Sequence, residues 1–432
     1  MGMAPRFLRR LFVSPIEELG ALAEELLSER GEASGVALAR ELLDAYAAAG
    51  ADVKLAFLIL LAQRFGAEPE RIERAIAKYQ EAPGAETARQ LHEAAEPRLQ
   101  EFLRRLNLAP GGIAVLVRMR EDVLKNISRH PELKQVDADF RHLFISWFNR
   151  GFLVLRRIDW STPASILDKI ILHEAVHEIT DWSDLRRRLD PGDRKCFAFF
   201  HPTLVDDPLI FVEVALTRAI PHAIASLLAE SRSPIDPERA SMAVFYSISN
   251  CQVGLQGVSF GDFLIKQVVE ELRRELPQLK TFVTLSPVPG FGAWLRRERE
   301  SVAQGALTAA DKEALRALDL SDWHRSANAD TALQPVLARA LCNYFFAAKN
   351  AAGKPLDPVA RFHLNNGARL ERLNWLGDVS AKGLREAAGF MVNYLYDLDD
   401  MEENHDAFAS RGEVAASRQV RLLVARKRAA DA

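Results

Sequence analysis

The chain has 432 residues, 48% of them hydrophobic and 27% charged, and a formal net charge of −3 from 56 basic and 59 acidic residues. This length exceeds one ordinary core, so we expect two or three domains, and the balanced charge excludes the basic excess typical of nucleic-acid-binding proteins. Three scattered cysteines and the absence of a bilayer-length apolar run indicate a cytoplasmic protein without a membrane partner, with a mitochondrial presequence in the basic first residues as the alternative.

Residues 1–150 predict a bundle of amphipathic helices, because apolar residues recur at spacings of three and four. We expect helices over residues 15–30, 34–49, 52–65 and 69–80, then longer helical stretches with a kink at Pro97. Ser14 and Glu17 form a capping box around Pro15, the first helical residue. Few polar residues of this region suit chemistry, so we interpret it as a domain for packing or subunit contact.

From residue 151 strands and helices alternate, which predicts an α+β domain over residues 151–432. We expect strands in the segments FLVLRRI, KCFAFFH, PLIFVEVALT, SMAVFYSISN and TFVTLSPVPGF. Helices are expected in PASILDKIILHEAVHEI and PHAIASLLAE, from about residue 260, over much of residues 308–349, and in the C-terminal region. The segment FHLNNGARLERLN is expected to be extended or mixed.

The segment HEAVH, from His173 to His177, lies on a predicted helix. Two histidines four residues apart share one helix face, and the glutamate between them can activate a zinc-bound water. Zinc needs a third protein ligand, however, and Thr180 and Ser183 stand where metzincins place glycine and histidine. We therefore favour an ordinary helix over a zinc peptidase and expect no metal.

A glycine-containing segment, NCQVGLQGVSFGDFLIK, places Gly254, Gly257 and Gly261 between a predicted strand and a helix. It is neither a Rossmann fingerprint nor a P-loop. A strand–loop–helix unit of this kind can grip a pyrophosphate with backbone N–H groups, and glycines let the backbone come close. GNAT acetyltransferases bind the pyrophosphate of coenzyme A through a similar turn, which this segment matches loosely. A plain connecting turn remains an equal alternative on these residues alone.

Two further stretches hold candidate catalytic side chains. In TLSPVPGF, Ser286 ends a predicted strand before Pro287, without the G-x-S-x-G elbow of hydrolases. In RFHLNNGARL, His363 lies between apolar neighbours and precedes an Asn-Asn-Gly turn. Taken alone, each is better explained as a structural residue.

Taken together, these segments resemble the malonyl-CoA decarboxylase family. The matching stretches are GFLVLRRIDWSTPA, EAVHEITDWSDLRRRL, DPLIFVEVALT, FYSISNCQVGLQGVSFGDFLIKQVVEELRRELPQLKTFVTLSPVPGF, FHLNNGARLERLNWLGDVS and VNYLYDL. They occur in the family's order and cover nearly all of the chain from Gly151 to about Leu398. The motifs GLQGV…LIK and LSPVPGF are the most specific.

The resemblance implies a helical oligomerisation domain over residues 1–150 and a GNAT-like catalytic domain over residues 151–432, in a homodimer or homotetramer. The implied reaction converts malonyl-CoA to acetyl-CoA and carbon dioxide without a metal or an organic cofactor. Ser286 and His363 match the family's catalytic pair. The expected substrate-binding residues are Gln252, Gly254, Gln256, Gly257, Val258, Ser259, Phe260, Gly261, Asp262 and Tyr394.

Loss of carbon dioxide from a malonyl thioester leaves negative charge on the thioester oxygen, so the thioester is itself the electron sink. We expect Ser286 to orient the carboxylate or the enolate oxygen. We expect His363, whose ordinary pKa lies near neutral, to protonate the carbanion. Ser259 stands where some family members carry an acidic residue, so a charge-based role there is in doubt.

Two other classes of function compete with this interpretation. A GNAT-type acyltransferase would use the same coenzyme site but needs an acceptor amine. A non-catalytic coenzyme-binding or scaffold protein would not need Ser286 and His363, whose presence argues against it.

Overall fold

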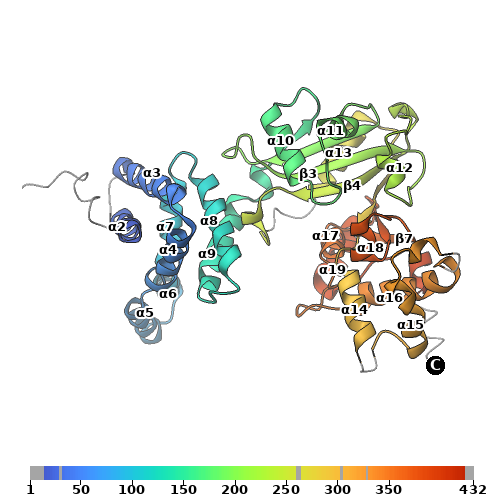
Figure 1. Cartoon of the computed structure of the whole chain (residues 1–432). Helices are drawn as coiled ribbons and strands as arrows, with labels where there is room; N and C mark the ends of the chain where they lie inside the picture. Colours follow the sequence, from blue (N-terminus) through green and yellow to red (C-terminus); the bar gives the residue numbers. More distant parts are fainter. Residues whose placement is uncertain (1–13, 29–31, 259–263, 302–304, 327–328, 424–432) are drawn as a thin grey trace, which may run out of the picture. The chain divides into compact units, whose positions relative to one another are not determined.

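The computed structural model describes residues 14–28, 32–258, 264–301, 305–326 and 329–423 (Figure 1). The chain divides into two compact units. Unit 1 comprises Met1–Val154, Phe200–Pro208 and Gln252–Phe260, and unit 2 comprises Leu155–Phe199, Leu209–Cys251 and Gly261–Ala432. Most of the glycine-containing segment therefore belongs to the same unit as the N-terminal helices.

Unit 1 is mainly helical, as predicted. Its described helices are α2 (Pro15–Ser28), α3 (Glu32–Ala48), α4 (Ala51–Arg64), α5 (Pro69–Glu81), α6 (Ala85–Ala95), α7 (Arg98–Asn107), α8 (Gly112–Asn126) and α9 (Leu133–Trp147). The apolar stripes of these helices meet in a core where the rings of Phe57, Phe65 and Phe102 pack edge to face or tilted.

The ends of these helices follow the local sequence. The predicted capping box is confirmed, because the Ser14 N–H donates to Glu17 Oε2 at 3.0 Å and the Glu17 N–H donates to Ser14 Oγ at 3.4 Å. Pro97 does more than kink a helix. Glu96, the residue before it, is extended with ψ 126°, so the predicted long helix is split into α6 and α7.

The strands expected from the sequence are present and join a mixed sheet. The strands are β1 (Val154–Ile158), β2 (Arg194–Phe200), β3 (Pro208–Thr217), β4 (Met242–Asn250), β5 (Thr281–Thr284), β6 (Ser286–Pro287), β7 (Arg369–Asn374) and β8 (Met391–Tyr396). Their order is β1-β2-β3-β4-β5-β8-β6, and β7 also pairs with β8. β3 is antiparallel to β4, β4 is parallel to β5, and β5, β6 and β7 are each antiparallel to β8.

The parallel strands β4 and β5 pair over a short distance and then part. Their register runs from Met242 opposite Thr281 to Phe245 opposite Thr284. Beyond that point β4 continues to Asn250, whereas the segment that follows β5 forms β6 and pairs with β8. β4 also carries a bulge, because its register with β3 shifts around Tyr246. A bulge bends a strand and re-aims its residues, and this one lies where the two strands separate.

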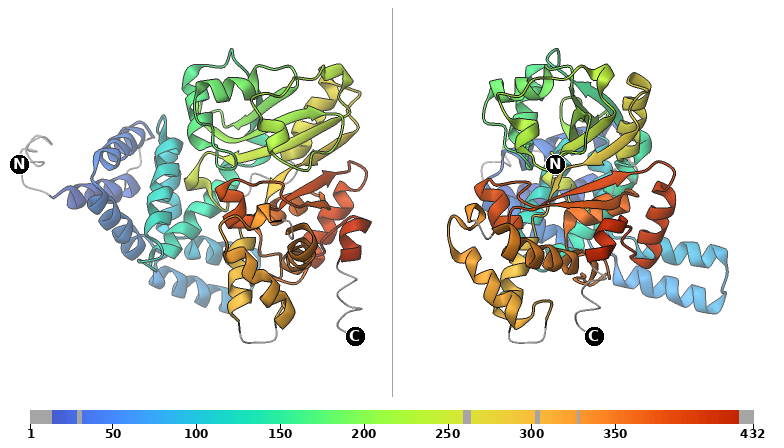
Figure 2. Two further views of the ribbon diagram at one scale, coloured as in Figure 1. Left: turned by 45° about the vertical axis from the view of Figure 1, so that its right-hand side comes forward. Right: turned by 90° about the vertical axis from the view of Figure 1, so that its right-hand side faces the viewer.

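The helices of unit 2 lie around this sheet and form most of the C-terminal region (Figure 2). The described ones are α10 (Ala164–His173), α11 (Trp182–Leu189), α12 (Ala225–Leu228), α13 (Leu264–Glu275), α14 (Phe291–Glu300), α15 (Ala309–Ala314), α16 (Gln334–Phe346), α17 (Pro358–Asn365), α18 (Ala381–Ala387) and α19 (Met401–Arg411). A helical region followed by a mixed-sheet domain is the predicted α+β class. The start of the helix expected near residue 260 lies outside the described residues.

Three local predictions were wrong in instructive ways. The helix expected through residue 179 ends at His173. The Glu174 carboxylate accepts the Val176 and His177 N–H groups that a continuing helix would use, and it is held by the Ser247 hydroxyl of β4 at 2.8 Å. The helix expected in PHAIASLLAE is reduced to α12, whose Leu227 carbonyl accepts a hydrogen bond from Arg194 at 2.7 Å. The C-terminal region that was expected to be helical contains strand β8. The segment FHLNNGARLERLN is mixed, as expected, with His363 in helix α17 and strand β7 after it.

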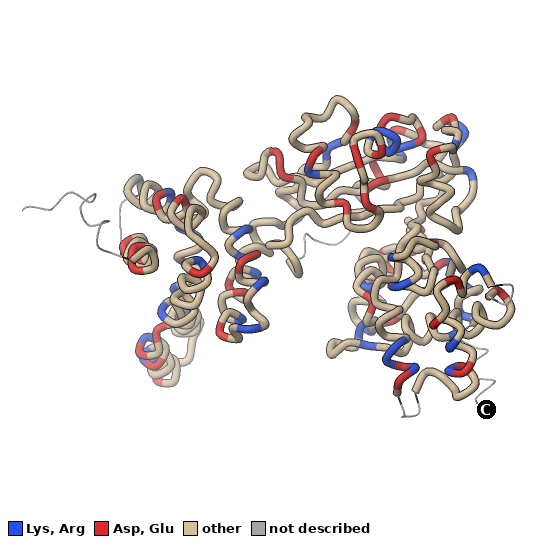
Figure 3. Tube along the Cα trace, viewed as in Figure 1, with Lys and Arg blue, Asp and Glu red and all other residues tan. Residues whose placement is uncertain are grey.

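Charged residues of both signs are distributed over the helices that the structure describes. Lysine and arginine alternate with aspartate and glutamate along the helices (Figure 3). No helix in the described part of the chain is both long enough and apolar enough to cross a membrane.

Candidate active site

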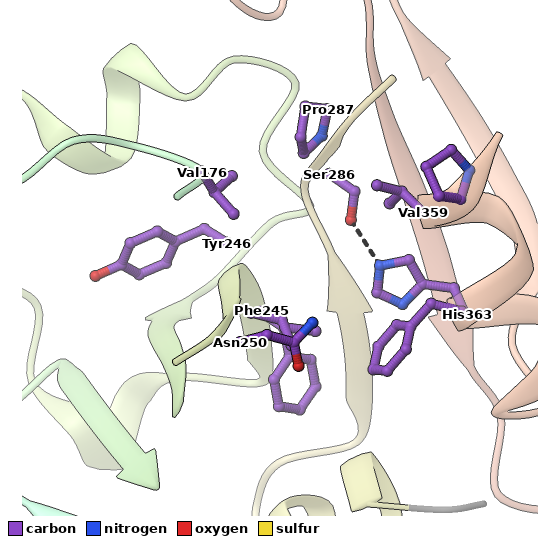
Figure 4. Close-up of a pocket in the computed structure, with 11 residues that line it drawn as sticks. Val176, Phe245, Tyr246, Asn250, Ser286, Pro287, Val359 and His363 are labelled. Atoms are coloured by element: carbon purple, nitrogen blue, oxygen red, sulfur yellow. Dashed lines mark hydrogen bonds between the residues drawn. The ribbon is translucent and has the colours of Figure 1, made fainter. Parts of the chain in front are cut away.

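The structure brings Ser286 and His363 into direct contact, although they lie 77 positions apart in the chain. Ser286 is the first residue of β6, and His363 lies in the last turn of α17. The Ser286 Oγ and His363 Nε2 atoms are 3.0 Å apart (Figure 4). Both side chains belong to unit 2 and are buried. The pair that the sequence suggested is therefore assembled within one unit.

Hydrogen bonds extend this pair on both sides. The Ser286 hydroxyl donates to Thr284 Oγ1 at 2.9 Å, and His363 Nδ1 lies 2.7 Å from the Tyr396 hydroxyl. Because the single Ser286 proton is directed at Thr284, His363 Nε2 donates to Ser286 Oγ, and Nδ1 accepts from Tyr396. This arrangement favours a neutral imidazole with its proton on Nε2, facing the serine.

Burial fixes the charge of the histidine. It lowers the pKa of His363 to about 3, from an ordinary value of 6.5, because a buried imidazolium lacks the solvation of water. The expectation that this pKa lies near neutral is therefore wrong, and the ring is uncharged at physiological pH.

Tyr394 supports the imidazole from one face. Its ring stacks on that of His363 with centroids 4.6 Å apart and planes 26° apart. The Tyr394 hydroxyl is buried and has no hydrogen-bond partner among the described residues. A direct contact of Tyr394 with substrate stays a prediction.

Ser286 and His363 line a cavity of about 220 Å³ at the place where β4 and the chain after β5 separate (Figure 4). The other lining residues are Val176, Phe245, Tyr246, Ile248, Asn250, Pro287, Pro358, Val359 and Phe362. No described residue of this lining is a lysine, arginine, aspartate or glutamate. The cavity is thus largely apolar, and the amide of Asn250 faces it together with the serine and histidine.

A buried carboxylate ties together the two segments that carry the pair. Asp357 caps α17 by accepting the Ala360 N–H at 2.8 Å. It also accepts the backbone N–H groups of Val359 and of Gly290, which ends the Ser-Pro-Val-Pro-Gly turn. Burial raises the pKa of Asp357 to about 6. This carboxylate thus connects the turn after the serine to the helix that carries the histidine.

In the glycine-containing segment, Gly254 is pressed against the helices of unit 1. A Cβ atom at this position would lie 1.9 Å from the carbonyl oxygen of Val117 in α8. The Gly254 carbonyl accepts a hydrogen bond from Arg120 at 2.7 Å, and Arg120 also forms an ion pair with Asp137 at 2.9 Å. The need for glycine at position 254 therefore comes from packing on α8. A phosphate contact at this position stays a prediction.

Gly257 has more open surroundings. It adopts φ +73°, a conformation that favours glycine, and the nearest atom to an added Cβ would be Arg141 Nε at 3.9 Å. Gln256 and Val258 donate their N–H groups within the segment, whereas the Gly257 N–H donates to none of the described residues. Gln252, the first residue of the segment in unit 1, donates its side-chain N–H to the Pro208 carbonyl at 3.2 Å. The predicted sites Ser259, Phe260, Gly261 and Asp262 lie outside the described residues.

The HEAVH segment lacks the helix that a zinc site of this type requires. The helix ends at His173, and the Glu174 carboxylate accepts the backbone N–H groups of Val176 and His177 at 2.8 Å each. Burial lowers the pKa of His177 to about 4. Within the described ranges, no three His, Cys, Asp or Glu side chains are grouped so that they could hold a metal ion.

Sequence reasoning missed Thr284, Tyr396 and Asp357. The twofold period of a strand could have found the first, because residues two apart share a face and Thr284 precedes Ser286 by two. The same spacing relates Tyr396 to Tyr394 in β8. An Asp before a Pro is a helix-start signal, and it would have placed the histidine on a helix.

Comparisons with known proteins assign both regions of the chain to the same family. A model of the malonyl-CoA decarboxylase N-terminal domain matches residues 65–148, and one of the C-terminal domain matches residues 151–432. The mitochondrial malonyl-CoA decarboxylase of Anser anser anser is 36% identical over 396 residues, which cover 84% of this chain and 78% of the relative.

Two crystal structures of bacterial malonyl-CoA decarboxylases are closely similar. The enzyme of Rhodopseudomonas palustris is 58% identical with a TM-score of 0.92, over 95% of this chain and 100% of that one. The enzyme of Agrobacterium vitis is 56% identical with a TM-score of 0.90, over 94% of this chain and 99% of that one.

Proposed function

Because the chain belongs to the malonyl-CoA decarboxylase family, we propose that it converts malonyl-CoA to acetyl-CoA and carbon dioxide with Ser286 and His363 as its catalytic pair. The observation that carries the assignment of the pair is the 3.0 Å contact between Ser286 Oγ and His363 Nε2 in the wall of the cavity. The cavity then receives the malonyl group.

The composition of the cavity suits a decarboxylation. A cationic side chain would stabilise the malonyl carboxylate and oppose its loss, and the described lining contains none. In an apolar pocket the charged carboxylate of the reactant is poorly solvated. Carbon dioxide is uncharged and loses little solvation there, so the pocket favours decarboxylation. The Asn250 amide and the Ser286 hydroxyl are the polar groups that can hold the thioester end in place.

The reaction needs one proton after the carbon–carbon bond breaks. The electrons of that bond move into the thioester and form an enolate, which takes the proton at its α-carbon to give the acetyl group. His363 Nε2–H is the proton source, directly or through the Ser286 hydroxyl. The transfer leaves an imidazolate, and because the carbon of a thioester enolate is a stronger base than an imidazolate, the neutral imidazole is a competent donor. After the product leaves, water protonates the imidazolate, and the hydroxide that remains is neutralised by a proton from the solvent.

Tyr396 and Tyr394 act through the histidine in this scheme. The Tyr396 hydroxyl holds Nδ1 as an acceptor, which keeps the transferable proton on Nε2. Tyr394 prevents the ring from turning by stacking on it. We propose that the glycine-containing segment from Gln252 to Asp262 holds the phosphate end of coenzyme A, where the family resemblance places that contact.

Incubation of the purified protein with malonyl-CoA alone tests this function. We expect one acetyl-CoA and one carbon dioxide for each malonyl-CoA consumed, with no loss of rate after exhaustive chelation. If malonyl-CoA persists until an amine is added and its acyl group then appears on that amine, the protein is an acyltransferase instead. If chelation abolishes turnover and zinc restores it, the metal-free scheme is wrong.

Two coarser properties stay predictions. We propose a homodimer or homotetramer to which the N-terminal helices contribute, and light scattering after gel filtration would contradict this by giving a monomer mass. We also propose a cytoplasmic location. Cell fractionation tests it against the mitochondrial location that is named for the relative from Anser anser anser.

A further inference from the structure

The segment that the proposed function assigns to coenzyme A is seated on the N-terminal helices. Its short helix η3 (Val253–Leu255) packs against α8, where Gly254 contacts Val117. Arg120 is 1% exposed, donates to the Gly254 carbonyl and is held by Asp137. A buried arginine in this position fixes the backbone of the segment, so these helices shape the loop as well as pack against one another.

A second arginine of the same helices lies on the open side of the segment. Arg141 is exposed on α9, and its Nε would be 3.9 Å from a Cβ atom added at Gly257. Asp137 stands four residues earlier on α9, where it could pair with Arg141, but it is engaged by Arg120. Arg141 forms no hydrogen bond or ion pair with any other described residue.

These two residues together offer the donors that a phosphate group needs. The Gly257 N–H is unused by the described residues, and Gly257 is exposed and has no side chain that could cover its backbone. The Arg141 guanidinium adds a planar fork of donors that matches two phosphate oxygens. An unpaired guanidinium beside an uncovered backbone N–H is suited to a doubly charged anion rather than to an apolar ligand.

We propose that Arg141 of the helical region binds the diphosphate of coenzyme A, with the Gly257 N–H as a second donor. The proposal rests on the proposed function, which supplies the ligand. Arg120 is then a positioning residue that holds the segment against α8, and Arg141 is a binding residue. The N-terminal helices thus gain a role in substrate binding, beyond the packing and subunit contact expected from their sequence.

Calorimetric titration of Arg141→Gln with three ligands tests the proposal. Coenzyme A and dephospho-coenzyme A both carry the diphosphate, whereas pantetheine carries no phosphate. We expect about tenfold weaker binding of the first two and unchanged binding of pantetheine, since a charge-assisted hydrogen bond is lost. Arg141→Lys should fall between, because lysine keeps the charge and loses the fork. Arg71→Gln, an exposed position on α5, is the matched control and should change nothing.

Each other result overturns the assignment. Unchanged affinity for coenzyme A removes Arg141 from the site, a loss confined to coenzyme A points to its 3′-phosphate, and an equal loss with pantetheine means that the segment itself was disturbed. Titration requires no turnover, so this result is independent of the reaction. A wild-type protein that binds coenzyme A through Arg141 but leaves malonyl-CoA intact would contradict the proposed function and not this inference.

Discussion

The Ser286–His363 pocket and the glycine-containing segment differ in how their functional groups are held. In the pocket Ser286 and His363 are buried, and each is fixed by a further hydrogen bond or a stacked ring. In the segment Gly257 and Arg141 are exposed, and the backbone is fixed from behind by α8. Chemistry needs fixed distances, whereas a phosphate can be bound at a solvated surface. Changes in the pocket should therefore lower kcat, and changes in the segment should weaken binding.

The largest effect is expected at the pair itself. His363→Asn removes the proton source and should lower kcat by about 10²–10⁴, the usual range for a lost general acid. Ser286→Ala should also lower kcat, and the double variant should lose less than the product of the two single losses, because the residues act as a unit. Stopped assays with malonyl-CoA on all four proteins measure this.

Binding provides the control for the pair. The affinity for coenzyme A should stay within a factor of about two in all four proteins, since the pocket is proposed to hold the acyl group. Near-normal kcat in folded His363→Asn would remove it as the proton donor, and multiplicative losses would mean that the two residues act independently.

A smaller loss is expected at Asp357. Asparagine keeps the size and capping ability of aspartate but presents an NH₂ group to backbone N–H donors, which should disturb the spacing of the two segments. We expect Asp357→Asn to lower kcat by up to about 10²-fold with little change in KM, because small misplacements of reacting groups are that costly. Asp139→Asn, which removes a buried carboxylate of unit 1, is the matched control.

The pH profile separates this role from a purely structural one. The pKa of Asp357 is raised to about 6, so the wild-type carboxylate gains a proton as the pH falls through that value, and kcat should fall with it. The groups that face it are the Arg361 guanidinium and the hydroxyls of Tyr344 and Tyr394, and burial raises the pKa of both tyrosines. In Asp357→Asn this acid limb should disappear, and an unchanged limb would assign it to another group.

The segment should respond to Gly254→Ala more strongly than to Gly257→Val. The first change forces a Cβ atom against the backbone of Val117 and should displace the segment from α8, with about tenfold weaker binding of coenzyme A. The second places its Cβ atom 3.9 Å from Arg141 Nε, an ordinary contact, and costs about 1–2 kcal/mol of backbone strain. Gly84→Ala, with nothing within 4 Å, is the control. The reverse order in calorimetry would mean that close approach at Gly257 matters more than seating on α8.

The smallest effect concerns stability. His363 and His177, with pKa values of about 3 and about 4, stay neutral in the fold, whereas the unfolded chain binds protons near 6.5. The unfolded state holds more protons between these values, so the free energy of unfolding should fall as the pH drops below 6.5, by about 2 kcal/mol per histidine at pH 5. His177→Gln should reduce that fall, measured by denaturant titration at pH 7.5 and 5.

The quantity to compare between His177→Gln and wild type is the change in the free energy of unfolding from pH 7.5 to pH 5. Asp357 and Glu213 have raised pKa values of about 6 and about 8, and so favour the fold at low pH. Their contribution is common to both proteins and cancels. Identical pH dependence in His177→Gln and wild type would show that the buried ring is not held neutral.

Most of the strands, and the two side chains that meet in the pocket, could be predicted from short-range signals, whereas β8 lies in a region that was expected to be helical. Runs such as VFYSISN and TFVTLS are buried strands by composition, and Ser286 and His363 lie in motifs specific to the family. The end of the helix at HEAVH could not be predicted from short-range signals. After His173 the Glu174 carboxylate accepts the next backbone N–H groups and is itself held by Ser247, 73 residues away. Tertiary contacts of this kind override helix propensity.

The requirement for glycine at position 254 also lay outside the local sequence. Gly254 was interpreted from the segment alone, as a residue that admits a phosphate. The contact that excludes a side chain there comes from Val117, on a helix 137 residues earlier in the sequence. The charge of His363 was also beyond a sequence pattern, because it depends on how completely the folded chain buries the ring.

The seating of Gly254 on α8 defines what can be exchanged between relatives. A chimera joined at residue 150 would combine the glycine-containing segment of one parent with the α8 of another, so that Val117 and Arg120 would meet an unfamiliar backbone. The structural unit to exchange is therefore discontinuous in sequence, because residues 252–260 belong with the N-terminal helices. Recombination that respects this unit keeps the contact intact, and recombination that follows the linear domain boundary divides it.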